Sequence, residues 1–311
     1  MNFPIIKTDK DFDTHFQSEI WLDVANLICQ HHQISFNELK RANSSEHIVF
    51  LMDNSLVLKI YRPFCDGFVR EKKALEFFSD KTSLKTPQII NTGEIEGFKY
   101  LIQTQISGEI MTRAEWLKLS ENSQKQFISK LAVNLKEIHQ LNSDSVRCDW
   151  TEFIKDRAET FIERQIAHGV NQSVLASLPA YIETNLNLVP MNPTVFMHSD
   201  VHLGNLPIFR VNGEWKIAGL VDFADSRKGF YEFDFLAVGI LIIQGQREIQ
   251  REFFKAYGYA EKDLDETMRR RLMMLTMLYD SADLRRYALR LKPEAVDFTL
   301  EELESGIWSF V

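Results

Sequence analysis

The sequence MHSDVHLGN at residues 197–205, followed by LVDF at residues 220–223, decides how this chain is organised. Asp200 and Asn205 are five residues apart, close enough for one short loop to present both side chains to a single point. The second segment adds the carboxylate of Asp222. Together the two segments supply two carboxylates and one amide oxygen for a common site.

The residues between these segments have the pattern of a β-hairpin. LPIF (206–209) and WKIAGLV (215–221) alternate like two strands, and the Asn212-Gly213 dipeptide between them accepts the positive φ values of a tight turn. A hairpin folds the chain back on itself. We therefore expect Asp222 to return to the neighbourhood of the loop that carries Asn205.

This set of groups suits the transfer of a phosphoryl group. Charge builds on the phosphate oxygens during that reaction, and Mg²⁺ must neutralise it. Because Mg²⁺ prefers oxygen ligands and keeps several waters, one carboxylate and one amide oxygen are a reasonable protein share. We assign Asn205 and Asp222 to Mg²⁺, and Asp200 to orienting an acceptor hydroxyl and taking its proton. A lone aspartate in a loop is more often a cap or turn former, so the prediction depends on the combination.

The same residues carry a resemblance to a known family. The pattern resembles the catalytic loop and metal-binding segment of the aminoglycoside phosphotransferase (APH) family, whose members are related to protein kinases and choline kinases. The family has an H-x-D-x-H-x-G-N loop, a hairpin, an I/V-D-F/W segment and a later D-L-A. This chain supplies His198, Asp200, His202, Gly204, Asn205, Asp222, Phe223 and then Asp234-Phe235-Leu236-Ala237.

The resemblance implies an α+β chain with the two-lobed fold of protein kinases. Residues 1–106 would form a small β-rich lobe that binds the nucleotide. Residues 107–311 would form a larger, mainly helical lobe that carries catalysis and the acceptor site. At 311 residues the chain is long enough for two lobes, each with its own core.

Periodic patterns predict several elements of these lobes. Residues 14–33 have one apolar helical face, and HIVFLM and SLVLKIY form a strand pair around the turn at Asp53-Asn54. A further strand pair turns at Glu96-Gly97. Phe127, Leu131, Leu135 and Ile138 recur at helical spacing and predict the buried face of a core helix. The apolar run FLAVGILII (235–243) predicts a buried helix, because it is far shorter than the roughly 20 residues that span a bilayer.

In the N-terminal lobe the resemblance implies a phosphate-binding ion pair. Lys59 matches the strand lysine that holds nucleotide phosphates, and Glu71 matches the helix glutamate that fixes its ammonium. Glu76, on the same predicted helix, is the competitor for that role. Lys59 alone would be a solvent-facing lysine on an amphipathic strand.

Two further stretches of this lobe match nucleotide-contacting positions of the family. Ser44 and Ser45 lie in the turn expected to cover the phosphates, although no G-x-G-x-x-G is present; a serine-rich turn without a ligand is the alternative. Gln103, Gln105 and Ile106 occupy the hinge, where backbone groups pair with the base. Backbone recognition leaves ATP and GTP equally open as donors.

The histidines and the later aspartate of the motif have supporting roles by the same resemblance. His198 would brace the loop backbone, and Asp234 would be a buried carboxylate that accepts hydrogen bonds from it. A helix N-cap is a further role for Asp234. His202 either braces the loop or touches the substrate. We interpret His139 as a packing residue.

Composition limits the partners and the compartment. The net charge of −8 argues against nucleic acid as a main partner. Three widely spaced cysteines offer no disulfide framework or zinc pattern, so we expect a reducing cytoplasm. The N-terminus has no apolar segment of signal-peptide length, and no membrane association is expected. We expect a monomer or a weak homodimer.

The function that these features favour is that of an ATP- or GTP-dependent small-molecule kinase, with an aminoglycoside as the leading acceptor. A choline-like alcohol, a sugar or a hydroxy amino acid is the alternative, and a catalytically silent nucleotide-binding pseudokinase is a second class. A cationic acceptor would fit a pocket lined by acidic residues of the C-terminal region, although such runs are more often solvated. Those residues are Asp280, Asp283, Asp297, Glu301, Glu302 and Glu304.

Overall fold

The computed structural model describes residues 3–42, 45–78, 81–144, 146, 148–294 and 297–311. The chain divides into two compact units. The first is Met1–Glu109 together with Ala218–Ser226, and the second is Ile110–Ile217 together with Arg227–Val311. The assignment of nucleotide binding to residues 1–106 and of catalysis to residues 107–311 stays a prediction.

The first unit is built on a five-stranded antiparallel sheet with the strand order β1-β2-β3-β5-β4. Its strands are β1 (Leu39–Arg41), β2 (Ile48–Met52), β3 (Leu56–Ile60), β4 (Ile89–Ile95) and β5 (Phe98–Thr104), and its helices are α1 (Asp9–His15), α2 (Ile20–His31) and α3 (Gly67–Phe78). β6 (Glu109–Ile110) follows β5.

Two tight turns set the strand pairing of this sheet. Asp53 and Asn54, between β2 and β3, have φ values of 48° and 52°. Glu96 and Gly97, between β4 and β5, have φ values of 48° and 83°. Left-handed residues at both central positions match the right-handed twist of the strands that the turn connects. Both predicted strand pairs are confirmed.

The two faces of the sheet differ because neighbouring side chains of a strand point to opposite sides. On one face, Leu58, Ile60 and Ile102 join a buried apolar core with Trp21 and Val24 of α2. Lys59 faces the other way, towards α3. The predicted helix over residues 14–33 is wrong in extent, since α1 ends at His15 and α2 begins only at Ile20.

The segment 218–226 is held in the first unit by its own contacts. The backbone N–H of Leu220 donates to the carbonyl of Lys85 at 2.9 Å. A Cβ on Gly219 would lie 2.5 Å from that same carbonyl oxygen, so only glycine permits this approach. The ring of Phe223 packs on that of Phe78 with 5.2 Å between centroids. Asp222 is therefore fixed within the first unit.

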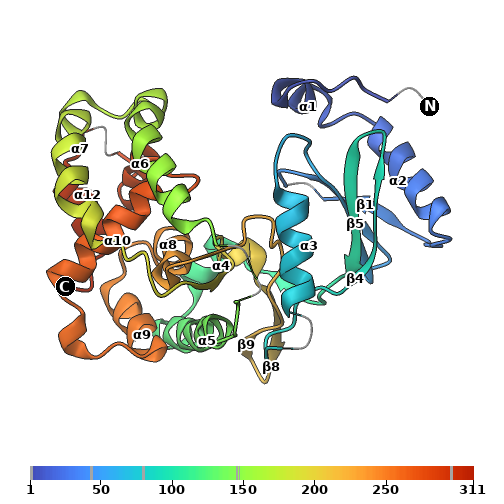
Figure 1. Cartoon of the computed structure of the whole chain (residues 1–311). Helices are drawn as coiled ribbons and strands as arrows, with labels where there is room; N and C mark the ends of the chain where they lie inside the picture. Colours follow the sequence, from blue (N-terminus) through green and yellow to red (C-terminus); the bar gives the residue numbers. More distant parts are fainter. Residues whose placement is uncertain (1–2, 43–44, 79–80, 145, 147, 295–296) are drawn as a thin grey trace. The chain divides into compact units, whose positions relative to one another are not determined.

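The second unit is mainly helical (Figure 1). Its helices are α4 (Arg113–Lys118), α5 (Glu121–His139), α6 (Trp150–Ala167), α7 (Gln172–Asn185), α8 (Phe235–Ala237), α9 (Arg247–Tyr257), α10 (Glu266–Leu278), α11 (Leu284–Leu291) and α12 (Leu300–Ile307). Its short strands are β7 (Val195–Met197), β8 (Pro207–Val211), β9 (Glu214–Ile217) and β10 (Arg227–Gly229).

The main sequence patterns of this unit have the expected structures. All four residues of the predicted α5 stripe are buried. β8 and β9 form the predicted hairpin, with Asn212 and Gly213 at φ values of 52° and 85°. The expected α+β chain, with a β-rich N-terminal lobe and a mainly helical C-terminal lobe, is confirmed.

The apolar run at residues 235–243 is buried and helical, but its second part is wider than an α-helix. Val238–Ile243 forms a π-helix, and Gln244 ends it in the left-handed conformation with φ of 53°. Within the described ranges, no helix is both long and apolar enough to cross a membrane.

We expect Leu135→Ala in α5 to lower the free energy of unfolding by about 2–5 kcal/mol, because it removes a buried side chain and leaves a cavity. Leu135 is 0 % exposed. The matched control is Val133→Ala on the same helix, where Val133 is 47 % exposed; this change should stay within about 0.5 kcal/mol. Urea denaturation followed by circular dichroism compares the two, and equal shifts would contradict the packing described for α5.

Candidate active site

Lys59 in β3 is a buried ammonium between two carboxylates. Its Nζ donates to Oε2 of Glu71 at 2.7 Å and to Oδ1 of Asp222 at 2.6 Å. The Lys59 side chain is only 4 % exposed. Burial by itself lowers the pKa of Lys59, but the two carboxylates outweigh it, and the pKa is raised above its ordinary value. The amine is therefore charged at neutral pH.

Glu71 is fixed by a second donor besides Lys59. The hydroxyl of Tyr61 donates to the same Oε2 at 2.6 Å. Burial and the charge of Glu71 raise the pKa of Tyr61 well above its ordinary value, so the phenol keeps its proton. Glu76, the predicted competitor, is exposed and pairs with Lys72 instead. The structure thus places Glu71, and not Glu76, against Lys59.

Asp222 has a left-handed backbone, with φ of 65°. Such a conformation in a residue other than glycine costs roughly 1–3 kcal/mol and persists only where the surroundings impose it. Here the surroundings are the contacts of Leu220 and Phe223 and the ion pair with Lys59. Strained residues of this kind gather at functional sites.

In the second unit, Asp200 accepts hydrogen bonds from three side chains. Tyr279 Oη donates to Oδ1 at 2.7 Å, and the Asn205 amide nitrogen approaches Oδ2 at 3.3 Å. His202 Nε2 also lies 3.3 Å from Oδ2. Burial raises the pKa of Asp200, but the hydrogen bonds from His202 and Tyr279 outweigh it, so the pKa is lowered. The carboxylate is therefore ionised at neutral pH.

The contacts of His202 determine which ring nitrogen carries the proton. Its Nδ1 accepts from the backbone N–H of Gly204 at 3.0 Å. A neutral ring that accepts at Nδ1 has its proton on Nε2. His202 therefore donates to Asp200, and it braces the loop at the same time.

Asp234 holds the backbone just before Asp200. Its Oδ2 accepts from the N–H of His198 at 3.0 Å, and its Oδ1 accepts from the N–H of Ser199 at 2.5 Å. These bonds hold Ser199 at a left-handed φ of 71°. His198 in turn accepts the N–H of Asp200 on its Nδ1 at 3.2 Å. Asp234 makes no side-chain capping bond to α8.

His139 is part of this support, which the sequence analysis missed. Its Nε2 lies 2.9 Å from Oδ2 of Asp234, and its Nδ1 lies 2.9 Å from the hydroxyl of Tyr257. Because a carboxylate accepts only, Nε2 donates to Asp234 and Nδ1 accepts from Tyr257. The position at the end of the α5 stripe indicated burial, but nothing local indicated these partners.

Tyr279 is the second residue that the sequence analysis missed. It follows the methionine-rich α10, and its side chain is almost completely buried. The only local signal was a polar hydroxyl at the end of a core helix. Such a group needs a hydrogen-bond partner when buried.

The predicted site residues thus fall into two sets. Lys59, Glu71 and Asp222 contact one another in the first unit. In the second unit, the loop of Asp200 and Asn205 rests on His198 and Asp234, as described above. The meeting of Asp222 with Asp200 and Asn205 stays a prediction.

The expected nucleotide loop and hinge are only partly described. Ser44 lies outside the described residues, and Ser45 Oγ accepts from the backbone N–H of His47 at 3.2 Å. In the hinge, the backbone N–H of Gln105 donates a hydrogen bond to the carbonyl oxygen of Ser55 at 2.8 Å. The roles of these residues and of Ile106 stay predictions.

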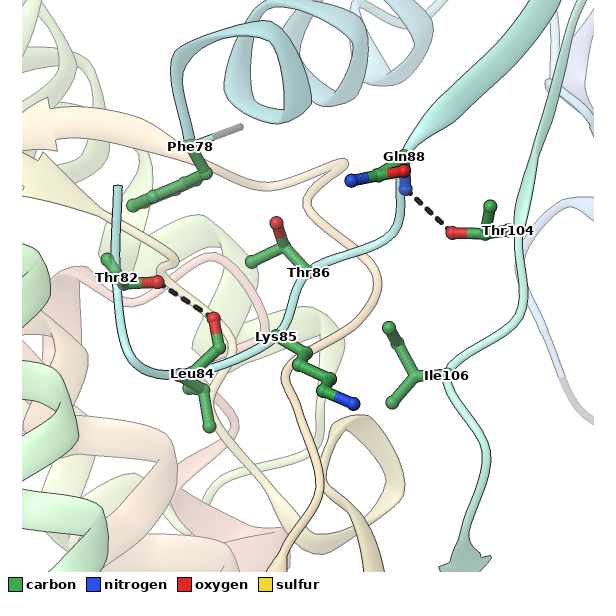
Figure 2. Close-up of a pocket in the computed structure, with 8 residues that line it drawn as sticks. All are labelled: Phe78, Thr82, Leu84, Lys85, Thr86, Gln88, Thr104 and Ile106. Atoms are coloured by element: carbon green, nitrogen blue, oxygen red, sulfur yellow. Dashed lines mark hydrogen bonds between the residues drawn. The ribbon is translucent and has the colours of Figure 1, made fainter. Parts of the chain in front are cut away.

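The side chains of the hinge alternate in direction. Thr104 and Ile106 line a pocket of about 280 Å³ with the loop that follows α3, and Thr104 Oγ1 accepts from Gln88 N–H (Figure 2). Gln103 and Gln105 are not part of its lining, and the Oε1 atom of each is buried without a partner in the described part of the chain. The pocket lies below the ~300–1,000 Å³ typical of small-molecule sites, so it does not identify the base site.

Asn205 has the donor chemistry expected of a Mg²⁺ ligand. Its amide nitrogen is committed to the backbone carbonyl and the carboxylate of Asp200. This orientation leaves the amide oxygen, a hard ligand of the kind that Mg²⁺ prefers. No group of three or more His, Cys, Asp or Glu side chains suited to a metal occurs among the described residues. The predicted Mg²⁺ ligands, Asp222 and Asn205, are one carboxylate and one amide, so they would not form a group of this kind.

Comparison with known proteins identifies one family. The phosphotransferase enzyme family, APH, matches residues 38–273. No curated protein sequence matches the chain significantly.

Solved structures share the fold at low sequence identity. The GDP complex of aminoglycoside 2'-phosphotransferase-IIIa has a TM-score of 0.70 and 15% identity, over 93% of this chain and 98% of that chain. The streptomycin–ATP complex of APH(2'')-IIa has a TM-score of 0.61 and 21% identity, over 90% and 97%. APH(3'')-Id from Streptomyces rimosus has a TM-score of 0.57 and 16% identity, over 82% and 98%. At these identities the likeness shows the kinase-like fold alone.

We expect Tyr279→Phe to raise the pKa of Asp200 by about one pH unit, because a hydrogen bond to a charged group contributes roughly 1.5 kcal/mol. Carbon-13 NMR titration of the Asp200 carboxyl measures this change. Tyr287→Phe is the matched control, since the Tyr287 hydroxyl donates to the backbone of Ser281 rather than to Asp200. An unchanged pKa in Tyr279→Phe would show that this bond does not stabilise the carboxylate.

Proposed function

This chain belongs to the phosphotransferase enzyme family, and from that premise we propose that it is a small-molecule kinase. It transfers the γ-phosphoryl group of ATP or GTP to a hydroxyl group of a small acceptor. The observation that carries the proposal is the buried ammonium of Lys59, held at 2.7 Å by Glu71 and at 2.6 Å by Asp222. A structural role alone does not require a second carboxylate on an amine that Glu71 already neutralises.

Lys59 and Glu71 bind the donor in this proposal. The ammonium contacts the nucleotide phosphates, and Glu71, itself held by Tyr61, keeps it in place when Asp222 leaves it. Asp222 and Asn205 are the proposed Mg²⁺ ligands. Bound Mg²⁺ neutralises the charge that develops on the phosphate oxygens. Nucleotides named with the related structures, ATP and GDP, support a purine nucleoside triphosphate as the donor.

Asp200 acts on the acceptor. Its ionised carboxylate orients the hydroxyl and accepts the proton as the oxygen attacks the γ-phosphorus. The new bond joins that oxygen to phosphorus, the bond to the β-phosphate oxygen breaks, and the nucleoside diphosphate leaves. His202 and Tyr279 keep Asp200 ionised before this step and hold it in position.

An aminoglycoside is the first acceptor to assay, because streptomycin appears in the complex of one related structure. Choline-like alcohols, sugars and hydroxy amino acids are the alternative. The interval from Asp222 to Asp234 is too short for an activation loop, which disfavours a protein substrate. We propose that the protein binds neither nucleic acid nor membranes. We further propose that it is located in the cytoplasm and is a monomer or a weak homodimer.

We expect Asp200→Asn to lower kcat by about 10²–10⁴-fold while nucleotide binding is retained, because the amide cannot accept the proton. A coupled assay of nucleotide turnover against the acceptor panel measures kcat. Asp144→Asn makes the same chemical change on a side chain that is 90% exposed, and it should leave kcat unchanged. Wild-type protein that binds nucleotide but transfers no phosphoryl group to any acceptor would instead identify a pseudokinase.

We expect Glu71→Gln to raise the KM for the nucleotide about tenfold, because a charged hydrogen bond to Lys59 worth roughly 1.4 kcal/mol is lost. Glu76→Gln on the same helix is the matched control and should leave KM unchanged. Initial rates at varied nucleotide concentration compare the two variants. Equal KM values in Glu71→Gln and wild type would contradict the proposed role of Lys59 and Glu71 in binding the nucleotide.

A further inference from the structure

Three arginines converge on the two residues that follow α10, directly beside Asp200. Tyr279 contacts Asp200 at 2.7 Å, and the next residue, Asp280, is paired with two guanidinium groups. Its Oδ1 lies 2.8 Å from Arg157 Nη2, and its Oδ2 lies 2.8 Å from Arg227 Nη2. The contact to Asp200 and the arginine pairs therefore come from one short segment.

The third guanidinium is that of Arg164, about two turns along α6 from Arg157. Its Nη1 approaches the carbonyl oxygens of Tyr279 and Asp280, each at 3.4 Å. Arg157, Arg164 and Arg227, which we call the arginine cluster, thus meet at Asp280: Arg157 and Arg227 pair with its carboxylate, and Arg164 approaches its carbonyl oxygen.

The arginine cluster is covered by protein rather than dispersed in solvent. The side chain of Arg227 is 7% exposed and stacks on Phe153 with 3.8 Å from Cζ to the ring centroid. The Nε atoms of Arg157 and Arg164 are buried, with no hydrogen-bond partner among the described residues. Burial, together with the charge of Arg157, lowers the pKa of Arg164. Buried guanidinium N–H groups without acceptors are costly, and an anionic ligand bound to these two arginines would offset that cost.

The acidic residues that could receive a cationic acceptor are engaged elsewhere. Asp283 caps α11 by accepting the N–H of Arg286, and Glu302 caps α12 together with Thr299. Glu304 is buried and binds Tyr181 and Arg269. With Asp280 neutralised by two arginines, four of the six residues considered for a polyamine-like pocket already have cationic or hydrogen-bonding partners.

We propose that the acceptor of this enzyme carries an oxyanion, a carboxylate or a phosphate, beside the hydroxyl group that Asp200 activates, and that the arginine cluster binds it. This inference rests on the proposed kinase function, because it names the acceptor class of the same site. Guanidinium groups suit this role, since their planar fork of N–H donors matches the geometry of carboxylate and phosphate oxygens. The exposed part of the Asp280–Arg157 pair, with side chains 36% and 17% exposed, is where the ligand reaches the arginine cluster.

Four probes with the same chain of hydroxyl groups test the charge preference. They are sorbitol, which is neutral; glucamine, which is cationic; gluconate, which carries a carboxylate; and sorbitol 6-phosphate. Thermal melting of the full chain at constant ionic strength reports binding of each probe. We expect gluconate or sorbitol 6-phosphate to raise Tm while sorbitol and glucamine do not, and the better of the two identifies the oxyanion.

Two substitutions of opposite sign locate the binding. Arg157→Gln should abolish the Tm rise caused by the oxyanion probe, and Asp280→Asn, which removes the neutralising carboxylate, should increase the affinity for that probe severalfold. The matched control is Arg247→Gln, which replaces an exposed arginine at the start of α9. It should change neither the Tm rise nor the affinity for the oxyanion probe. The opposite expectations for Arg157 and Asp280 separate a loss of binding from a loss of folding.

Several results would overturn the inference. They are a larger Tm rise with glucamine or kanamycin than with gluconate and sorbitol 6-phosphate, no rise with any probe, or a rise that Arg157→Gln leaves intact. Phosphoryl transfer is measured separately, by comparing Asp200→Asn with its control Asp144→Asn in the coupled assay. Oxyanion binding without transfer would refute the proposed kinase and leave the oxyanion site standing, whereas efficient transfer to aminoglycosides would support the kinase and refute the oxyanion acceptor.

Discussion

The first unit depends on the ion pairs that the buried ammonium of Lys59 makes. A charge removed from water needs partners of opposite sign at hydrogen-bond distance, because desolvation otherwise exceeds any gain. Glu71 of α3 and Asp222 of the segment 218–226 supply them. A single buried charge thereby joins the sheet, a helix and a segment that is remote in sequence, and removing either carboxylate would weaken the attachment of all three.

The second unit uses a buried carboxylate for the same purpose. Asp234 accepts two backbone N–H groups of the loop before Asp200 and a ring N–H of His139. These bonds stabilise the left-handed backbone of Ser199, which would otherwise be costly. Asp200 is therefore held by the backbone on one side and by Tyr279 and His202 on the other. A carboxylate fixed in this way keeps both its position and its ionised state, which are the two requirements for a group that receives a proton.

The acceptor side departs from what the net charge of the chain suggests. An acidic chain is compatible with a cationic ligand, yet the arginine cluster contacts Tyr279 and Asp280, and Tyr279 contacts Asp200. Local charge decides recognition, because charges in solvent separated by more than roughly 8–10 Å are largely screened. A fold does not fix the substrate, and we propose that the residues around Tyr279 and Asp280 set the acceptor preference of this chain.

The sequence by itself determined the features that depend on neighbouring residues. The turns at Asp53-Asn54 and Asn212-Gly213 follow from which residues tolerate positive φ, and the α5 stripe follows from a helical period of 3.6 residues. The motif around Asp200 was also readable, and the family resemblance that it carries implied the pairing of Lys59 with Glu71.

Only the tertiary structure decided the partners that are distant in the chain. Tyr279 is 79 residues from Asp200, His139 is 95 from Asp234, and Asp280 is 123 from Arg157. The break between α1 and α2 and the π-helix after α8 were equally hidden in their apolar patterns. The physical reason is that backbone preferences act over a few residues, whereas the partner of a buried polar group is set by which helices and strands pack together.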